Sequence, residues 1–271
     1  MPPITDQKKN GKFFTFPLPL LYPMEPHTKT LSRIFSYCVL TVGESSLANL
    51  PEETADGILS RAASPDDFDD AEETHRHVVL GCDRLDVKIG TIRGVLAEAK
   101  EAREIVRETE RINGASPLVF VGAKLLWECY KGEFPFRDFT VLCAVNSVIG
   151  MKTTPQLIRR TLLLARAAGF KTPATYGKGC MKGFKARPMM TVDELRWTLD
   201  KLEKRELFAR AQASPRRVYF SKGPREKLLA DVAAIVAKQS STKIADRRKD
   251  EREAMQKARG AASKSTDDLA F

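Results

Sequence analysis

The chain has 271 residues, of which 42% are hydrophobic and 30% charged, a balance typical of a mainly globular protein of one or two domains rather than a disordered chain. No apolar run is long enough to cross a membrane, and the N-terminal segment lacks the basic and apolar parts of a signal peptide. The 5 cysteines are scattered and form no Cys-x-x-Cys pair. We therefore expect a cytoplasmic protein with no metal site, no cofactor and no membrane contact.

Charge is distributed unevenly along the chain. Residues 1–150 contain 17 Lys and Arg against 22 Asp and Glu, a net charge of −5. Residues 151–271 contain 28 against 13, a net charge of +15. Scattered charges usually form an ordinary solvated surface, but an excess of this size in one half favours binding of a polyanion by that half.

The first half of the chain is predicted to be helical. Residues 13–23 are apolar and rich in proline, so they are expected to lie extended across another element. Apolar residues at helical spacing predict helices over residues 28–42, 52–61, 92–113 and 117–130. Gly43 is expected to end the first of these helices. Residues 1–133 are thus interpreted as a helical, acidic N-terminal region, whose Cys38 and Cys129 are expected to be small core residues.

The second half is predicted to contain both helices and a hairpin. Helices are expected over residues 139–149, 155–168, 191–206 and 224–238, a loop over 170–190, and strands over 208–212 and 217–221. Cys143 is expected to be buried in the first of these helices. After residue 240 the chain is rich in Lys, Arg and Ala and nearly lacks large apolar residues, so residues 241–271 are expected to be a basic tail that is disordered or becomes helical only when bound.

The most informative stretch starts at Thr191. The sequence Thr191-Val192-Asp193-Glu194 fits a capping box, in which the first and fourth residues satisfy each other's backbone N–H groups at the start of a helix. Leucines at positions 195, 199 and 202 then form one apolar stripe. The short strands that follow carry several arginines, so a helix and a basic hairpin are predicted side by side.

This order of elements resembles the winged helix-turn-helix domains of bacterial regulators and of plasmid or phage replication initiators. The resemblance covers about residues 139–238 and implies a winged helix-turn-helix domain over residues 134–240 with one β-hairpin wing. The expected fold class is therefore mainly α, with a helical N-terminal half. Two features depart from the family: the linker 169–190 is long, and Asp193 and Glu194 place carboxylates where phosphate would approach.

The resemblance implies which residues contact double-stranded DNA. The candidates are Arg196, Trp197, Lys201 and Lys204 on the helix, Arg210, Arg216 and Arg217 on the hairpin, and the flanking Arg159 and Arg160. Wing arginines are expected to contact phosphates or the minor groove, because a guanidinium group suits both. Two other interpretations stay open: an ordinary solvated helix face, and a winged helix that binds protein instead of DNA.

The sequence thus predicts a non-enzymatic DNA-binding protein that serves as a transcription regulator or a replication initiator. The acidic N-terminal half is available for protein partners. The alternative is a nicking enzyme with His75 and His77 as metal ligands and Tyr130 or Tyr176 as nucleophile. Arg76 stands between the two histidines where such enzymes have a hydrophobic residue, so the pair is interpreted as an exposed helix end.

Overall fold

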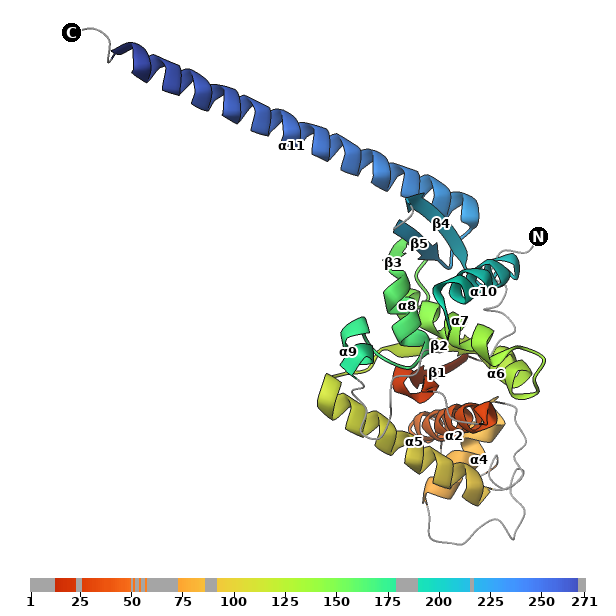
Figure 1. The fold of residues 1–271 in the computed structure, drawn as a ribbon. Helices are drawn as coiled ribbons and strands as arrows, with labels where there is room; N and C mark the ends of the chain where they lie inside the picture. The colour runs from red at the N-terminus through yellow and green to blue at the C-terminus, as the bar shows by residue number, and fades with distance from the viewer. Residues whose placement is uncertain are drawn as a thin grey trace.

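The structure is a computed structural model that describes residues 13–22, 26–49, 51, 54, 57, 73–85, 92–178, 190–214 and 217–267 (Figure 1). Its helices are η2 (Leu18–Leu21, a 3-10 turn), α2 (His27–Leu47), α4 (Glu73–Leu85), α5 (Ile92–Asn113), α6 (Ala123–Tyr130), α7 (Phe136–Ile149), α8 (Arg160–Ala167), α9 (Pro173–Lys178), α10 (Val192–Lys204) and α11 (Arg225–Asp267). Its strands are β1 (Phe13–Pro17), β2 (Leu118–Gly122), β3 (Gln156–Ile158), β4 (Ala209–Ser214) and β5 (Arg217–Ser221). The chain is mainly helical with small antiparallel sheets, as the sequence predicts.

The strands form two separate antiparallel sheets. In the first, β1 pairs with β2, so that Phe13 lies opposite Gly122 and Pro17 opposite Leu118. In the second, the strand order is β3-β5-β4. The predicted extended segment 13–23 is confirmed over β1, whereas residues 18–21 form the 3-10 turn η2. The predicted hairpin is confirmed as β4 and β5, and it gains β3 as a third strand.

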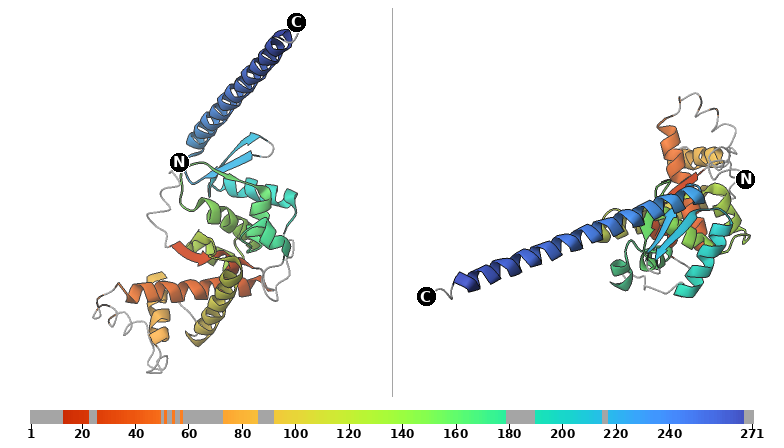
Figure 2. Two further views of the ribbon diagram at one scale, coloured as in Figure 1. Left: turned by 90° about the vertical axis from the view of Figure 1, so that its left-hand side faces the viewer. Right: turned by 90° about the horizontal axis from the view of Figure 1, so that it is seen from above.

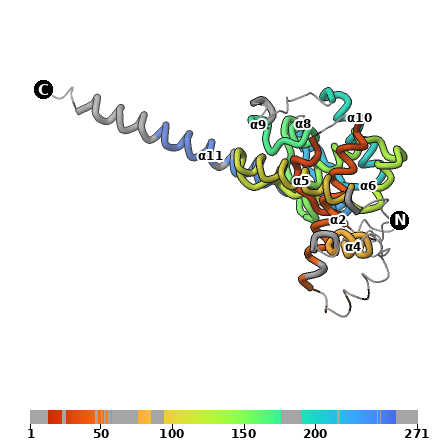
Figure 3. Tube along the Cα trace, turned by 90° about the horizontal axis from the view of Figure 1, so that it is seen from below, coloured from red at the N-terminus to blue at the C-terminus, as the bar shows by residue number. Residues whose placement is uncertain are grey.

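Helices α2, α4 and α5 pack together (Figure 3), and in Figure 1 they lie at the end of the molecule opposite the hairpin. The expectation that Gly43 ends the first helix is wrong, because α2 continues to Leu47. Gly43 instead lies where α2 meets α4: a Cβ at this position would lie 1.5 Å from the carbonyl oxygen of His77. The lack of a side chain at Gly43 therefore allows α2 and α4 to cross closely, and it does not mark the end of a helix.

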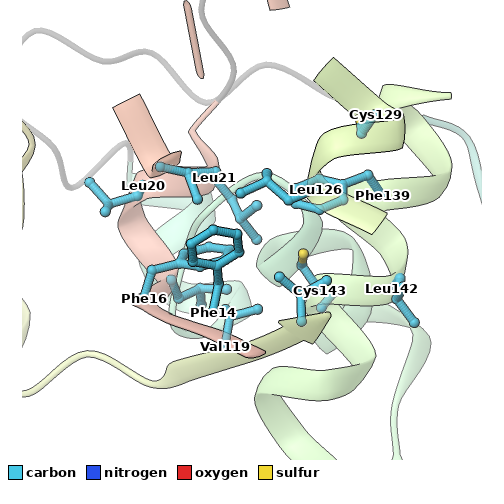
Figure 4. Packing of buried hydrophobic residues seen from close by; sticks show 14 of the residues in the cluster. Phe14, Phe16, Leu20, Leu21, Val119, Leu126, Cys129, Phe139, Leu142 and Cys143 are labelled. Carbon is cyan, nitrogen blue, oxygen red and sulfur yellow. The ribbon is translucent and has the colours of Figure 1, made fainter. Parts of the chain in front are cut away.

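One cluster of buried side chains joins the two halves of the chain. It extends from Phe14 on β1 to Phe220 on β5, and thus crosses the boundary at residue 133 that the sequence predicts. Figure 4 shows part of it, where Phe14 and Phe16 of β1 lie beside Val119 of β2. The three cysteines expected in the core, Cys38, Cys129 and Cys143, are buried and free, and burial raises the pKa of each thiol. Cys180 lies outside the described residues.

Two segments expected to be helical begin with strands. Residues 117–130 form β2 followed by α6, and the segment from 155 forms β3 followed by α8. In β2 the buried Val119 and Val121 alternate with more exposed neighbours, which is the two-residue period of a strand. The expected loop 170–190 begins with the short helix α9, and residues 179–189 are outside the described part of the chain. The predicted helix 52–61 also falls largely outside it.

The last helix is much longer than the sequence predicts. α11 has 43 residues and runs to Asp267, through most of the segment that was expected to be a disordered tail. Its first turns pack on the hairpin, where Leu228 and Val232 meet Ala209, Ala211 and Tyr219. Beyond them it projects from the body as a single helix (Figures 1 and 2). Among the described helices, none combines the length and the apolar character needed to cross a bilayer.

Candidate nucleic-acid interface

α10 begins with the capping box that the sequence predicts. The Thr191 hydroxyl accepts a hydrogen bond from the Glu194 backbone N–H at 3.2 Å, and the Glu194 carboxylate accepts one from the Thr191 N–H at 2.7 Å. These bonds, led by the backbone N–H of Thr191, lower the pKa of Glu194. Arg137 donates to the same carboxylate at 2.9 Å. Glu194 is thus bonded within the protein. Of the two carboxylates in the first turn, Asp193 is the one without an ion pair to a described residue, so it is the one whose charge would repel an approaching phosphate.

The inner face of α10 fixes which of its residues point outward. Leu195, Thr198, Leu199 and Leu202 are buried against the core. Trp197 is 77% exposed, and Arg196 and Lys204 are also exposed. Neither Arg196 nor Lys204 forms an ion pair with another described residue. Three of the four helix residues predicted to contact DNA, namely Arg196, Trp197 and Lys204, are therefore exposed and form no ion pair with a described residue.

An open groove of about 370 Å³ lies between α10, the start of α8 and the three-stranded sheet. Its apolar lining includes Leu195, Leu199 and Phe220. Its charged lining consists of Arg160, Arg196, Arg210 and Arg225 together with Asp200 and Glu203. Arginines outnumber carboxylates, so the groove is basic. Arg225, on the first turn of α11, has no distinctive sequence signal and is the one groove arginine that the sequence interpretation missed.

Arg210, which the sequence predicts to contact DNA, is paired with carboxylates of the protein itself. Its guanidinium group pairs with Asp200 and hydrogen-bonds Glu203 at 3.2 Å through Nε, and its side chain is only 21% exposed. Glu203 lies in addition 3.8 Å from Arg225. The charge of Arg210 is therefore neutralised by carboxylates of the protein itself. This arginine fastens strand β4 to α10 and is not a free contact for a phosphate group.

Lys201 is engaged in a similar way. Its ammonium group lies 2.5 Å from the carboxylate of Asp138, whose side chain is only 3% exposed. Asp138 stands in the first turn of α7, 63 positions earlier in the chain. A buried carboxylate needs a partner of opposite charge, so this pair ties α10 to α7. Lys201 thus has a structural partner although 52% of its side chain is exposed, and its contact with DNA stays a prediction.

The remaining candidates lie around the same region. Arg159 immediately precedes α8 and Arg160 begins it, and both are exposed. Arg217 on β5 is exposed and donates a hydrogen bond to Gln239 of α11. Arg216 lies outside the described residues. The structure thus brings Arg160, Arg196 and the hairpin into one region.

Of the histidine pair that the sequence predicts to be an exposed helix end, the structure describes the side chain of His77, which is largely buried. His77 lies on α4 with 15% of its side chain exposed, and its Nδ1 is 4.0 Å from the carboxylate of Glu44 on α2. Tyr130 is exposed and stacks on Trp127 at a ring separation of 5.7 Å. The side chains of His75 and Tyr176 are not among those described. Within the part of the chain that is described, no three His, Cys, Asp or Glu side chains are grouped to hold a metal ion.

Comparison with family models, with curated proteins and with solved structures finds no match for this chain. The functional assignment therefore rests on the residues and their geometry.

Proposed function

We propose that this protein binds double-stranded DNA through α10 and the adjoining hairpin, as a transcription regulator or a plasmid or phage replication initiator acting in the cytoplasm. The observation that carries the proposal is the outer face of α10. There Arg196, Trp197 and Lys204 are exposed, and a two-stranded hairpin lies beside them. Unlike Lys201 and Arg210, neither Arg196 nor Lys204 forms an ion pair with a described residue. A helix that enters the major groove needs exposed donors of this kind.

The order of elements supports a winged-helix interpretation. α7, β3, α8 and α10 are followed by the hairpin, and β3 pairs with β5 to complete a small sheet. Such an arrangement places one helix and one wing toward a duplex. The insertion of α9 and of residues 179–189 between α8 and α10 is a departure from the compact turn typical of this class.

A second candidate function is protein binding by the same face. The observation that favours it is the composition of α10, where Asp193 and Asp200 flank the highly exposed Trp197. Carboxylates repel phosphate, whereas an exposed tryptophan is typical of the centre of a protein interface. Binding measurements on duplex DNA separate the two functions.

The proposal is tested by titrating the protein with duplex DNA at several salt concentrations. About 5 neutralised phosphates should give a slope of log affinity against log salt of about −4 to −5. Arg196→Ala should weaken binding to a preferred site by about 1–3 kcal/mol relative to other sequences, if the side chain contacts a base edge. Arg217→Ala should weaken binding to all sequences alike.

A flat salt dependence, or the absence of binding at low salt, would rule out the DNA-binding proposal and leave the protein-binding alternative. Unchanged sequence preference in the Arg196→Ala protein would show that α10 does not read bases. Glu206→Ala is a suitable control, since this exposed residue follows α10 and has no predicted role in the interface.

A further inference from the structure

We infer that the projecting part of α11 is a second DNA-binding element, which contacts the phosphates of the duplex beyond the segment covered by α10 and the hairpin. This inference rests on the proposed function and extends it. It concerns the region from Lys238 to Arg252, whose described side chains are all exposed.

The first step is that this region lacks the apolar side chains that would pack against another helix or a membrane. Between residues 238 and 255 the only large apolar side chains are Ile244 and Met255, which are 54% and 66% exposed. A coiled coil with a second copy of the chain needs apolar residues about every 3.5 positions, and these two are eleven apart. Neither a second helix nor a membrane surface is therefore the expected occupant of this helix.

The second step is that its charges are sorted by face. Successive residues of an α-helix are turned by about 100°. Lys238, Arg248, Lys249 and Arg252 consequently fall within a sector of about 100°, which we call the basic stripe. Asp246, Asp250 and Glu253 fall on another sector, centred about 120° away. The stripe thus offers cations on one side of the helix and keeps most carboxylates off that side.

The third step is that the cations of the stripe are available. Arg248, Arg252 and Lys238 form no ion pair with any described residue. Lys249 lies 3.9 Å from Glu253, an exposed pair that contributes little. Arg247, which lies outside the stripe, is paired with Glu251 at 3.0 Å. Three of the four cations on the stripe can therefore bind an anion without first losing an internal partner.

The fourth step is the position of the stripe relative to the hairpin. Arg217 of β5 donates a hydrogen bond to Gln239, one residue after the start of the stripe. From Lys238 to Arg252 the helix rises by about 21 Å, the length of about six base pairs. A duplex held at the hairpin can thus continue along the stripe. The charge and the reach both fit the DNA backbone, which carries a phosphate charge about every 1.7 Å of its axis.

The test compares two fluorescein-labelled duplexes, one of 12 and one of 30 base pairs that contains the same sequence at its centre. The longer duplex extends 9 base pairs, about 31 Å, further on each side of the shared sequence, so that it can cover the whole stripe. Arg252→Gln and Arg248→Gln should each weaken binding to the longer duplex about three- to tenfold and lower the salt slope by about 1. Both variants should bind the short duplex like the unmodified protein. Circular dichroism checks that the helix is retained, as glutamine is a good helix former.

Arg247→Gln is the matched control, because it removes the same charge one position away from the stripe. It should leave binding to both duplexes unchanged. Equal losses in the Arg247→Gln and Arg252→Gln proteins, or equal losses on both duplexes, would overturn the inference while the binding proposal stands. If the unmodified protein binds neither duplex, the proposed function and this inference fail together. A dimer seen by light scattering that Arg252→Gln dissociates would assign the stripe to a second copy instead.

Discussion

Gly43 of α2 and Gly81 of α4 face each other at the crossing of the two helices. A Cβ on Gly81 would lie 1.9 Å from the carbonyl oxygen of Val39, and one on Gly43 would lie 1.5 Å from that of His77. No real side chain tolerates such distances, so the two helices approach as closely as their backbones allow. Gly43 and Gly81 thereby bring His77 to the Glu44 carboxylate on the neighbouring helix.

Because the two helices lie so close, adding a single methyl group between them should lower the stability of the protein strongly. Gly81→Ala must push the two helices apart and should lower the free energy of unfolding by about 3 kcal/mol, at the upper end for overpacking. Gly122→Ala is the control, since a Cβ there meets nothing within 4 Å. Urea denaturation of both variants measures the difference. Equal stability of the two proteins would contradict the tight crossing.

The structure also assigns Arg210 to stability, and this can be measured without DNA. Arg210→Ala leaves the carboxylates of Asp200 and Glu203 without their shared partner and should cost about 1–2 kcal/mol of unfolding free energy. Lys204→Ala removes the same charge from the exposed side of α10 and should change stability by less than about 0.5 kcal/mol. If Arg210→Ala is fully stable but binds DNA poorly, the sequence interpretation of this arginine is right.

Much of the fold could be predicted from local pattern. The capping residues Thr191 and Glu194 and the leucine stripe define α10, and the charged helix 92–113 was predicted with the bounds that α5 has. The strands were harder to predict. The apolar run at 118–122 fits a helix or a strand equally well in such a short window. β3 has only three residues and depends on β5, whose Phe220 lies opposite Gln156.

The site was predictable in part, for a physical reason. The spacing of the leucines determines that Arg196, Trp197 and Lys204 face outward, because helix geometry is local. Whether a cation is free is decided by partners elsewhere in the chain. Asp138, which neutralises Lys201, is distant in sequence, and Arg210 acquires its partners only when the hairpin folds onto α10.

Lys222 predicts a pH dependence of stability. Burial lowers its pKa to about 8, and its ammonium group donates to the carbonyl oxygen of Leu207 at 2.7 Å. Between about pH 8 and the usual lysine value near 10.4, the unfolded chain binds more protons at this position than the folded one. This lysine therefore destabilises the fold below pH 8, and its contribution to stability rises with pH across that window.

The measurement is the difference in unfolding free energy between Lys222→Met and the unmodified protein from pH 7 to 10.5. The variant keeps an unbranched side chain, one atom shorter than lysine, but has no charge to bury, so its advantage over the unmodified protein should shrink as the pH rises. Lys227→Met removes a lysine from the exposed side of α11 and should show no such trend. A constant difference for Lys222→Met would mean that Lys222 keeps its ordinary pKa in the folded protein.

The fluorescence of Trp197 can report on the proposed interface, because the chain has only 2 tryptophans. Trp127→Phe leaves Trp197 as the sole tryptophan, and its 77% exposure predicts strong quenching of tryptophan fluorescence by acrylamide. Binding of duplex DNA by α10 covers this side chain, so quenching should fall at least about twofold in proportion to the saturation of the protein. The Trp197→Phe protein reports on Trp127 of α6, which should respond little. If duplex binds without protecting Trp197, α10 is not the contact surface, and the exposed tryptophan becomes evidence for a protein partner.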